Sequence, residues 1–386
     1  MEADTFDIIH ALFGLPTGKL VFIIMVVVMA LFQFFWIFNF LSRTLFIKKQ
    51  LNHSKQPVSI IIAARNEAIR LESLLPVLLQ QNYPDFEIIV ADDRSVDGTG
   101  VLVKRMASSD NRLRYIRIEA TTDVIHGKKH ALTRGINEAK NEWLLFIDAD
   151  CVPVSDLWIQ SMANAMQPDK DIVLAYSGFF AEKRAVNALI RYDAAIIAMQ
   201  YLGMASAGIP YMGVGRNLMY RRNIWERLAG FESHAHLASG DDDLFVMQAA
   251  TATNTAIAFH AEAITRSQTK TGFLLWRNQK LRHLSTSRKY RPHIAALLLA
   301  EPLTRVLFLV FAVTGLFVLP VSVALLLAGL WFLRAGLLAI IQVKFLKKAG
   351  EDNFGLMALV FDVILPFVYL YFFSYQILTK QKPDWK

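Results

Sequence analysis

Asp148 and Asp150 are the residues of this 386-residue chain whose type and spacing most directly suggest chemistry. They follow the apolar run 143–147, which is typical of a buried strand because it is short and ends abruptly in polar residues. Acids two positions apart at a strand end point the same way, about 6–7 Å apart. Such a pair can hold a divalent cation through oxygen ligands and leave positions open for phosphate oxygens. The alternative is a pair of solvated acids at a strand exit.

A second acidic pair, Asp92 and Asp93, ends another apolar run at 86–91. Carboxylates there can accept hydrogen bonds from a base N–H or a ribose hydroxyl, and two consecutive acids at a buried strand end are costly unless they are used. Lys128 and Lys129 open a helical stretch, where a positive charge opposes the helix dipole. We therefore expect Lys128 to contact a phosphate, with a solvated lysine as the alternative.

A third acidic group comprises Asp241, Asp242 and Asp243. Adjacent carboxylates repel one another, which raises the pKa of at least one and suits it to accept a proton from a sugar hydroxyl. The alternative is an acidic start for the helix predicted at 244–250, where negative charge is favourable.

Gln279 and Arg282 lie in the basic stretch 277–291. Their spacing places them on one helix face, and a guanidinium beside an amide suits a diphosphate group. The alternative is a basic helix that is attracted to anionic lipid at a membrane surface.

The elements that must position these residues alternate between strand and helix. Strand candidates lie at 58–63, 86–91, 113–118 and 143–147, and helix candidates at 66–80, 100–107 and 129–139. This alternation predicts right-handed βαβ units, a mostly parallel sheet and an α/β fold, with ligands at the carboxyl ends of the strands. Neither a G-x-G-x-x-G after the first strand nor a P-loop motif is present, which disfavours a nicotinamide dehydrogenase or a P-loop NTPase.

The composition indicates membrane-spanning segments, because 54% hydrophobic residues and a mean hydropathy of +0.34 are too apolar for an ordinary soluble protein. The net charge of +8 fits contact with anionic lipid headgroups on the cytoplasmic side. No basic stripe with interleaved aromatic residues is present, so we expect no nucleic-acid partner. The single cysteine, Cys151, excludes an internal disulfide and fits a reducing compartment.

One apolar segment lies near the N-terminus and a longer region lies near the C-terminus. Leu20–Leu41 contains no charge and precedes a basic flank, which predicts an uncleaved anchor whose C-terminal side is cytoplasmic. Residues 306–343 would form one helix of about 57 Å, so we expect two spans joined near Pro320. The run 354–379 can form a further span, but the lysines after it would then lie outside, against the positive-inside rule.

Two ionisable residues interrupt these apolar runs, Arg334 and Asp362. We expect them to snorkel or to face protein, with a lumen or acceptor path as the alternative. The predicted domains are 1–47 with a span at about 20–41, a cytoplasmic α/β domain at 48–290, and a membrane region at 291–386 with spans at about 303–319, 321–343 and 356–378.

Taken in order, these motifs resemble those of the membrane-bound family 2 glycosyltransferases with a GT-A nucleotide-diphospho-sugar domain, in the group that includes cellulose, hyaluronan and poly-N-acetylglucosamine synthases. The resemblance covers residues of about 50–290 and the arrangement of the flanking spans. It rests on Ser59–Glu67 (SIIIAARNE), Asp92–Thr99 (DDRSVDGT), Gly127-Lys128, Asp148-Ala-Asp150, Gly213–Arg222 (GVGRNLMYRR), Gly240-Asp241-Asp242 and Gln279-x-x-Arg282.

The resemblance implies an inverting transfer of a sugar from a nucleotide-diphosphate donor, expected to be a UDP-sugar, with Mg²⁺ or Mn²⁺ as cofactor. Asp242 would be the general base with Asp241 beside it, and Asp148 and Asp150 would hold the metal. The donor would lie against Ala64, Asn66, Glu67, Asp92, Asp93, Lys128, Asp148, Gln279 and Arg282, and the acceptor side would include Gly215, Asn217 and His283.

One departure from the family pattern concerns His283. Processive members have tryptophan at this place, and an imidazole offers an acceptor sugar less stacking area than an indole. We therefore expect transfer to a lipid-linked or cell-envelope glycan acceptor at the cytoplasmic face of the cell membrane, in contact with membrane lipids. The alternative is a processive polysaccharide synthase that couples polymerisation to export. A non-catalytic membrane scaffold is disfavoured because every motif acid is present.

Overall fold

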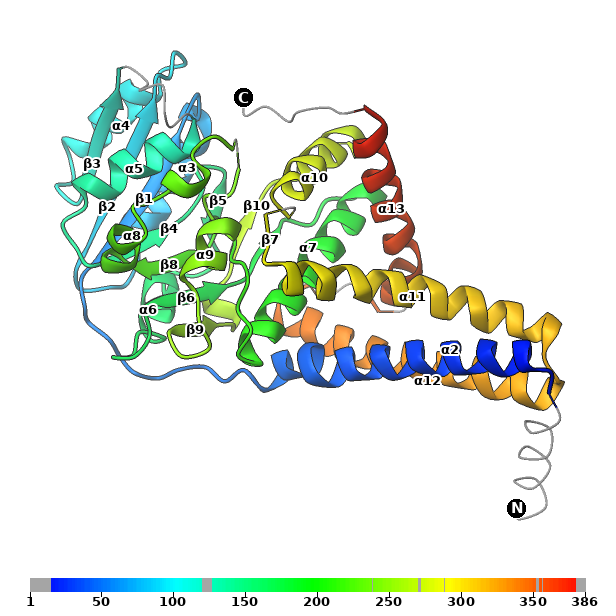
Figure 1. Ribbon diagram of the computed structural model, residues 1–386. Coiled ribbons are helices and arrows are strands. Elements are labelled where there is room, and N and C mark those ends of the chain that lie inside the picture. Colours follow the sequence, from blue (N-terminus) through cyan, green and yellow to red (C-terminus); the bar gives the residue numbers. More distant parts are fainter. Residues whose placement is uncertain are drawn as a thin grey trace.

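Buried apolar strands form the centre of the catalytic-type domain. The structure, a computed structural model, describes residues 15–119, 127–237, 239–269, 272–287, 289–351, 354–355 and 357–379. Its main sheet has the strand order β3-β2-β1-β4-β8-β6-β9 (Figure 1). The strands are β1 (Val58–Ala64), β2 (Phe86–Asp93), β3 (Leu113–Ile118), β4 (Trp143–Phe146), β6 (Ile172–Ala175), β8 (Leu218–Arg221) and β9 (Thr255–Ala258).

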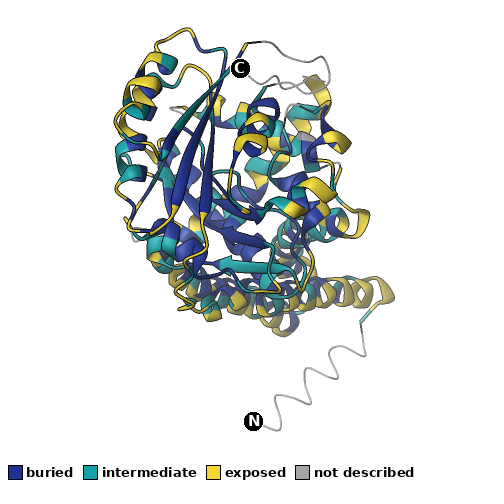
Figure 2. Cartoon of the chain, turned by 90° about the vertical axis from the view of Figure 1, so that its left-hand side faces the viewer, coloured by how far each residue is buried: buried dark blue, intermediate teal, exposed yellow. Residues whose placement is uncertain are grey.

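This sheet is mostly parallel, as predicted. The pairs β1–β2, β1–β4, β2–β3 and β6–β9 are parallel, and β8 is antiparallel to both of its neighbours. Figure 2 shows the strands buried between the surrounding helices. The α/β fold predicted from the strand and helix alternation is confirmed.

Alternating strand residues explain why helices cover both faces of the sheet. Ile60 and Ile62 pack with the buried leucines of α3 (Ala68–Leu79) and α4 (Thr99–Ala107), whereas Ile61 faces Leu132 and Ile136 of α5 (Lys128–Glu138). The other helices of the domain are α6 (Trp158–Ala163), α7 (Ala185–Ser206), α8 (Arg222–Arg227), α9 (Asp243–Ala249) and α10 (Phe273–Ser287).

A second sheet begins where the Asp148-Ala-Asp150 segment ends. Its order is β5-β10-β7, with β5 (Cys151–Pro153), β10 (Thr265–Ser267) and β7 (Ser177–Phe179). The strand predicted at 143–147 stops at Phe146, and Asp148 to Asp150 form the crossing between the two sheets. The two acids are therefore held at both ends by paired strands.

Among the residues that the structure describes, four helices are long and apolar enough to cross a membrane. The first is α2 (Thr17–Trp36), which continues through the short helical turns η1 (Ile37–Leu41) and η2 (Ser42–Phe46), and the others are α11 (Pro292–Val318), α12 (Val321–Lys348) and α13 (Met357–Thr379). The predicted arrangement of one N-terminal and three C-terminal apolar helices is confirmed, and the long apolar run is broken at Pro320 as expected. Only α11 begins well before its predicted span, at Pro292, and its first three turns include His293 and Glu301.

Buried charges join these helices to one another. Asp362 of α13 pairs with Arg334 of α12 at 2.7 Å and with Arg305 of α11 at 3.0 Å. Gln33 of α2 accepts from Arg334 at 3.0 Å and donates to the carbonyl of Glu301 at 3.0 Å. Arg334 and Asp362 thus face protein, as expected, and each charge is paired because an isolated one would be costly there.

The N-terminal apolar helix also docks on the α/β domain, at a glycine. A Cβ added to Gly203 of α7 would overlap the carbonyl oxygen of Phe40 and lie 2.9 Å from its carbonyl carbon. The close approach of the two helices at this point therefore requires a residue without a side chain.

We expect Gly203→Ala to lower the free energy of unfolding by about 1–3 kcal/mol, the usual cost of overpacking. Gly329→Ala in α12 is the matched control, because nothing lies within 4 Å of its added Cβ. Thermal unfolding of both variants in detergent measures the difference. Equal melting temperatures for the two variants would show that the contact between α7 and the segment after α2 is not tight.

Candidate functional site

The carboxyl ends of β1, β2 and β4 lie along one edge of the sheet. In the parallel register Ala64 is the partner of Asp92, and Ile61 is the partner of Phe146. Strands β2 and β4 flank β1 on either side. Asp93 is the last residue of β2, and Asp148 comes shortly after the end of β4. This edge is where ligands bind in parallel α/β sheets.

Two loops at this edge hold each other in a strained conformation. Asn66 and Arg94 both have a φ of 58°, in the left-handed region that residues with side chains rarely adopt. The Asn66 N–H donates to Ser95 Oγ at 2.8 Å, and the Val96 N–H donates to Asn66 Oδ1 at 2.9 Å. Backbone strain of this kind is characteristic of functional sites.

Glu67, also predicted to be near the donor, is tied to the same loops. Its N–H donates to Thr99 Oγ1 at 3.0 Å, and its carboxylate pairs with Arg70 at 2.6 Å. Burial, with a contribution from the charge of Asp150, raises the pKa of Glu67, although Arg70 opposes this rise. Glu67 therefore lies within electrostatic reach of Asp150 across the sheet edge.

The two acids at the end of β2 differ in their surroundings. Asp92 is buried and accepts hydrogen bonds from the Ser95 N–H at 2.9 Å, the Tyr115 hydroxyl at 2.7 Å and Arg117 at 3.0 Å. Burial raises the pKa of Asp92, but these donors outweigh burial and lower it overall. One oxygen of Asp92 is thus bound by the following loop and the other by two side chains of β3, so its carboxylate positions these segments. The predicted contact of Asp92 with the donor would have to replace one of these bonds.

Asp93 is the acid of this pair that faces other charges at the edge. Its carboxylate accepts from Arg94 Nε at 2.8 Å and lies 3.8 Å from Arg65. Both arginines are partly exposed, while the Asp93 side chain is buried. A ligand that reaches Asp93 would therefore also meet two guanidinium groups.

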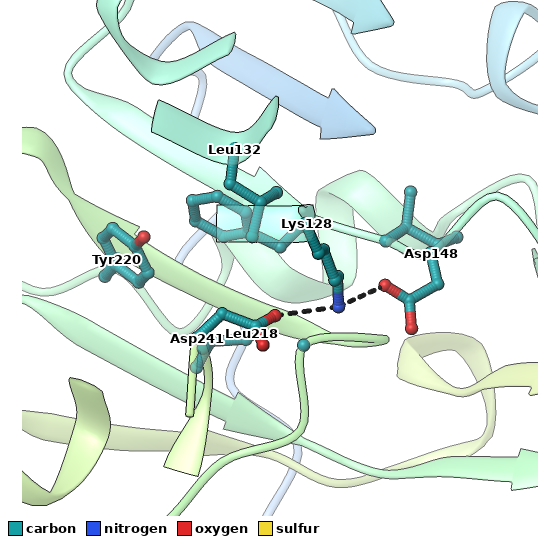
Figure 3. Close-up of a pocket in the computed structure, with 9 residues that line it drawn as sticks. Lys128, Leu132, Asp148, Leu218, Tyr220 and Asp241 are labelled. Carbon is teal, nitrogen blue, oxygen red and sulfur yellow. Dashed lines mark ion pairs between the residues drawn. The ribbon is translucent and has the colours of Figure 1, made fainter. Parts of the chain in front are cut away.

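Lys128 links two acidic segments that are far apart in the sequence. Its Nζ lies 2.7 Å from Asp148 Oδ1 and 2.8 Å from Asp241 Oδ2 (Figure 3). Burial lowers its pKa, but Asp148, Asp241 and Asp242 together raise it well above the ordinary lysine value, so the ammonium stays charged. These residues line a small pocket together with Leu132, Phe146, Ile147, Gly215, Leu218 and Tyr220.

The neighbouring lysine has a different environment. Lys129 is buried and donates to the backbone carbonyls of His234 at 2.6 Å and Leu237 at 3.0 Å. Burial lowers the pKa of Lys129 to about 8. Lys129 therefore fixes the segment that leads into the acidic group, while Lys128 points into the pocket.

Asp241 and Asp242 carry opposite pKa shifts. Burial raises the pKa of Asp241, but pairing with Lys128 lowers it overall. For Asp242, burial and the charges of Asp241 and Asp243 raise the pKa to about 7. Asp242 Oδ2 accepts the Gly215 N–H at 2.8 Å and its Oδ1 accepts the Asp243 N–H at 2.8 Å. Asp242 also caps α9, so the expected helix-start role and the expected raised pKa both occur in this group.

Asp243 connects the acidic group to α10. Its Oδ2 accepts hydrogen bonds from the Thr286 hydroxyl at 2.5 Å and the Tyr290 hydroxyl at 2.9 Å. The helix held in this way carries Gln279 and Arg282, both partly buried, and the exposed His283. Sequence reasoning missed this link, because a threonine and a tyrosine downstream carry no signal of a partner in the acidic group.

Of the three residues predicted on the acceptor side, Gly215 lies at the pocket, His283 is exposed on α10, and Asn217 is buried. Gly215 lines the pocket, and a Cβ there would lie 3.3 Å from Lys128 Nζ and 3.5 Å from Asp241 Oδ2. Asn217, in contrast, has no exposed surface. Its amide oxygen accepts from the Trp158 indole N–H, and its amide nitrogen donates to the carbonyls of Tyr176 and Ala263. It cannot touch an acceptor, and instead joins the two sheets.

Asp148, Asp150 and Cys151 could together hold a metal ion, because their candidate ligand atoms all lie within 4.8 Å of one another. The two carboxylates are partly exposed, whereas Cys151 is buried and its thiol donates to Asp150 Oδ1 at 3.4 Å. Burial raises the pKa of the Cys151 thiol well above its ordinary value. The donor set available to an ion is therefore an oxygen pair, which fits Mg²⁺ or Mn²⁺ better than a thiolate-binding metal.

We expect Thr286→Val to loosen α10 by about 1–3 kcal/mol, because the variant leaves a buried carboxylate with one hydroxyl donor fewer. Hydrogen exchange of residues 273–287 should rise in this variant. Ser287→Ala is the control, since that hydroxyl donates only to the carbonyl of Leu284 in its own helix. Unchanged exchange in Thr286→Val would show that Asp243 does not anchor the helix.

Comparison with known proteins agrees with this geometry. Residues 59–228 match the model of glycosyl transferase family 2. A 4,4'-diaponeurosporenoate glycosyltransferase of Staphylococcus aureus is 32% identical over 119 residues, which are 31% of this chain and 30% of that protein. A GalNAc(5)-diNAcBac-PP-undecaprenol beta-1,3-glucosyltransferase of Campylobacter jejuni is 30% identical over 93 residues, 24% of this chain and 29% of that protein. The matches thus span less than a third of either relative.

A solved structure extends the likeness to most of the chain. A mannosyltransferase from Pyrobaculum calidifontis, in complex with GDP-Man and Mn²⁺, superposes with a TM-score of 0.53 at 18% identity, over 90% of this chain and 99% of that one. At this identity the likeness concerns the fold. Residues 59–228 therefore match the glycosyl transferase family 2 model within an α/β domain of GT-A-like fold, which is joined to apolar helices of membrane-spanning length.

Proposed function

We propose that this protein transfers a sugar, with inversion, from a nucleotide-diphosphate donor to a lipid-linked or cell-envelope glycan acceptor. The observation that carries the proposal is the pocket in which Lys128 bridges Asp148 and Asp241 beside Asp242. It places a cation, a candidate metal-binding acid and a carboxylate with a pKa of about 7 at the ligand-binding edge of the sheet.

The donor would lie along the edge from β2 to β4. Asp93, with Asn66 and Glu67, would meet the nucleoside, and a UDP-sugar remains the expected donor. The diphosphate would lie near Lys128, with Gln279 and Arg282 covering it from α10. The carboxylates of Asp148 and Asp150 would hold Mg²⁺ or Mn²⁺, which when bound offsets the negative charge of the diphosphate.

The residues of the chain supply the proton transfer. Asp242 would accept the proton of an acceptor hydroxyl while that oxygen bonds to the anomeric carbon and the bond to the diphosphate breaks. The two backbone N–H donors keep the carboxylate of Asp242 in one orientation. Asp241 would stay ionised beside Lys128, so its charge helps to raise the proton affinity of Asp242.

The membrane helices support an acceptor that is held at a lipid surface. The Campylobacter relative is named for an undecaprenol-linked acceptor. Basic residues flank the ends of α2 and α12 that adjoin the α/β domain, namely Arg43, Lys48, Lys49, Lys344, Lys347 and Lys348. By the positive-inside rule these ends would be cytoplasmic, which puts the donor pocket on the cytoplasmic face of the cell membrane.

Asp150→Ala should lower Mn²⁺ affinity by at least about 10-fold, since even the loss of an outer partner of a metal ligand costs that much. Electron paramagnetic resonance of the purified protein measures Mn²⁺ binding, and release of nucleoside diphosphate from a panel of donors measures turnover. Asp169→Ala removes an exposed acid that pairs only with Lys170 and is the control. Full metal-dependent turnover in Asp150→Ala would overturn the metal assignment.

Asp242→Asn should lower the rate by about 10²–10⁴-fold while donor binding survives, because only the proton acceptor is lost. A base must be deprotonated to act, so the wild-type rate should rise with pH through about 7, and this step should vanish in the variant. Turnover assays and donor-binding titrations, each carried out across a range of pH, separate the effect on the rate from the effect on donor affinity. An equal loss of donor affinity would remove Asp242 from the role of base.

Mass spectrometry of the product distinguishes a single addition from a processive polymer.

A further inference from the structure

The last apolar helix, α13, runs in a different direction from the other three. Figure 1 shows α2, α11 and α12 side by side as one long bundle that extends from the α/β domain, while α13 starts beside this bundle and rises steeply away from it along the domain. By length and composition α13 could span a membrane. Length and composition therefore leave the direction of α13 open, and its contacts with the other helices decide it.

The apolar core at the far end of the bundle is built without α13. It contains residues of α2 such as Val26, of α11 such as Phe308, and of α12 such as Val323 and Leu327. Among the residues that the structure describes, α13 contributes none to this core. Its buried side chains belong instead to the large core that joins the α/β domain and α7 to the domain-side ends of α2 and α12, namely Ala358, Phe361, Leu365 and Phe372.

The first half of α13 meets the bundle near mid-height. Asp362 pairs with Arg334, which lies 13 residues after the start of α12, or about 20 Å from its far end. A hydrocarbon core is about 30 Å thick, so this contact lies toward the side of the membrane that carries the α/β domain.

The second half of α13 leaves the bundle and packs on α10 and α7. Tyr369 donates to Asp193 of α7, which also pairs with Lys280 of α10. The Arg277 guanidinium of α10 lies 4.2 Å from the ring centre of Tyr375. The Gln376 amide donates to the carbonyl of Leu281 at 3.5 Å. A helix that spanned back alongside α12 would place these same residues at the far end of the bundle.

One face of α13 stays apolar and exposed. Met357, Val360, Ile364 and Phe367 are all exposed and recur every three or four residues, so they form one stripe along the helix. The opposite face holds the buried residues and the polar partners described above. A helix that is apolar on one side and bound to protein on the other fits the boundary between headgroups and hydrocarbon.

We propose that α13 lies along the membrane surface on the side of the α/β domain, with its exposed stripe in the lipid, rather than crossing the membrane. The end of the helix at Thr379 then stays on the catalytic side. This removes the conflict with the positive-inside rule, because Lys380, Lys382 and Lys386 follow Thr379 in the sequence. It also makes a lipid-embedded helix the direct neighbour of α10, which carries Gln279 and Arg282.

Single cysteine substitutions test the sidedness of Thr379 without any activity assay. Ser109→Cys reports the α/β domain, Ser322→Cys reports the far end of α12, and Thr379→Cys reports the end of α13, all at exposed positions. The native Cys151 is buried, so the unsubstituted chain measures background labelling. A membrane-impermeant maleimide, applied to spheroplasts and to inverted vesicles, should label Thr379→Cys from the same side as Ser109→Cys. Labelling from the side of Ser322→Cys would overturn the proposal.

Spin labels at Ile364→Cys, Phe367→Cys and Leu378→Cys, which are exposed on the same side of the helix, supply an independent measurement of depth in lipid vesicles. A helix that lies in the membrane plane should give similar depths at all three positions. A spanning helix should give depths that differ by about 20 Å between the first and the last, at about 1.5 Å per residue. The second result would contradict the proposal even if sugar transfer were confirmed, and the first would support it even if transfer were not.

Discussion

The pairing of Lys128 with Asp148 and Asp241 is the interaction on which the rest of the site depends. Two acidic segments converge where burial weakens solvent screening, so without the ammonium between them their carboxylates would repel each other strongly. The arrangement also explains a lysine at the first position of α5, where the helix dipole alone would disfavour it. Gly215 belongs to the same constraint, since a Cβ there would lie only 3.3 Å from Lys128 Nζ and in contact with Asp241.

A continuous set of contacts runs from this pocket to the membrane helices. Asp242 and Asp243 are adjacent, Asp243 holds Thr286 of α10, and α10 packs on α13. Asp362 of α13 then pairs with α11 and α12. The helix that would cover a bound diphosphate is thus positioned by the acidic group on one side and by lipid-facing helices on the other. This arrangement suits an acceptor that reaches the site from the membrane.

The residues that sequence reasoning placed best are those whose role follows from local geometry. Two acids at the end of an apolar run had to lie at the edge of the sheet, and adjacent acids had to compete for protons, as Asp241 and Asp242 do. Asn217 and Asp92 were predicted to meet a ligand, yet both are buried and hydrogen-bonded to protein, because a motif residue can serve either a ligand or the surrounding chain. Burial decides between these roles, and burial depends on segments as distant as Trp158 and Arg117.

The sequence by itself determined the alternation of strands and helices, the edge at which the acids collect, and the number and positions of the apolar helices. These features follow from periodicity and composition within short windows. Only the tertiary structure decided that Lys128 joins Asp148 to Asp241, that Asp243 holds α10, and that α13 rises away from the bundle along the domain. Each of these depends on contacts between segments far apart in the chain. Many other pairings of charged groups and of apolar faces would satisfy the local sequence pattern equally well.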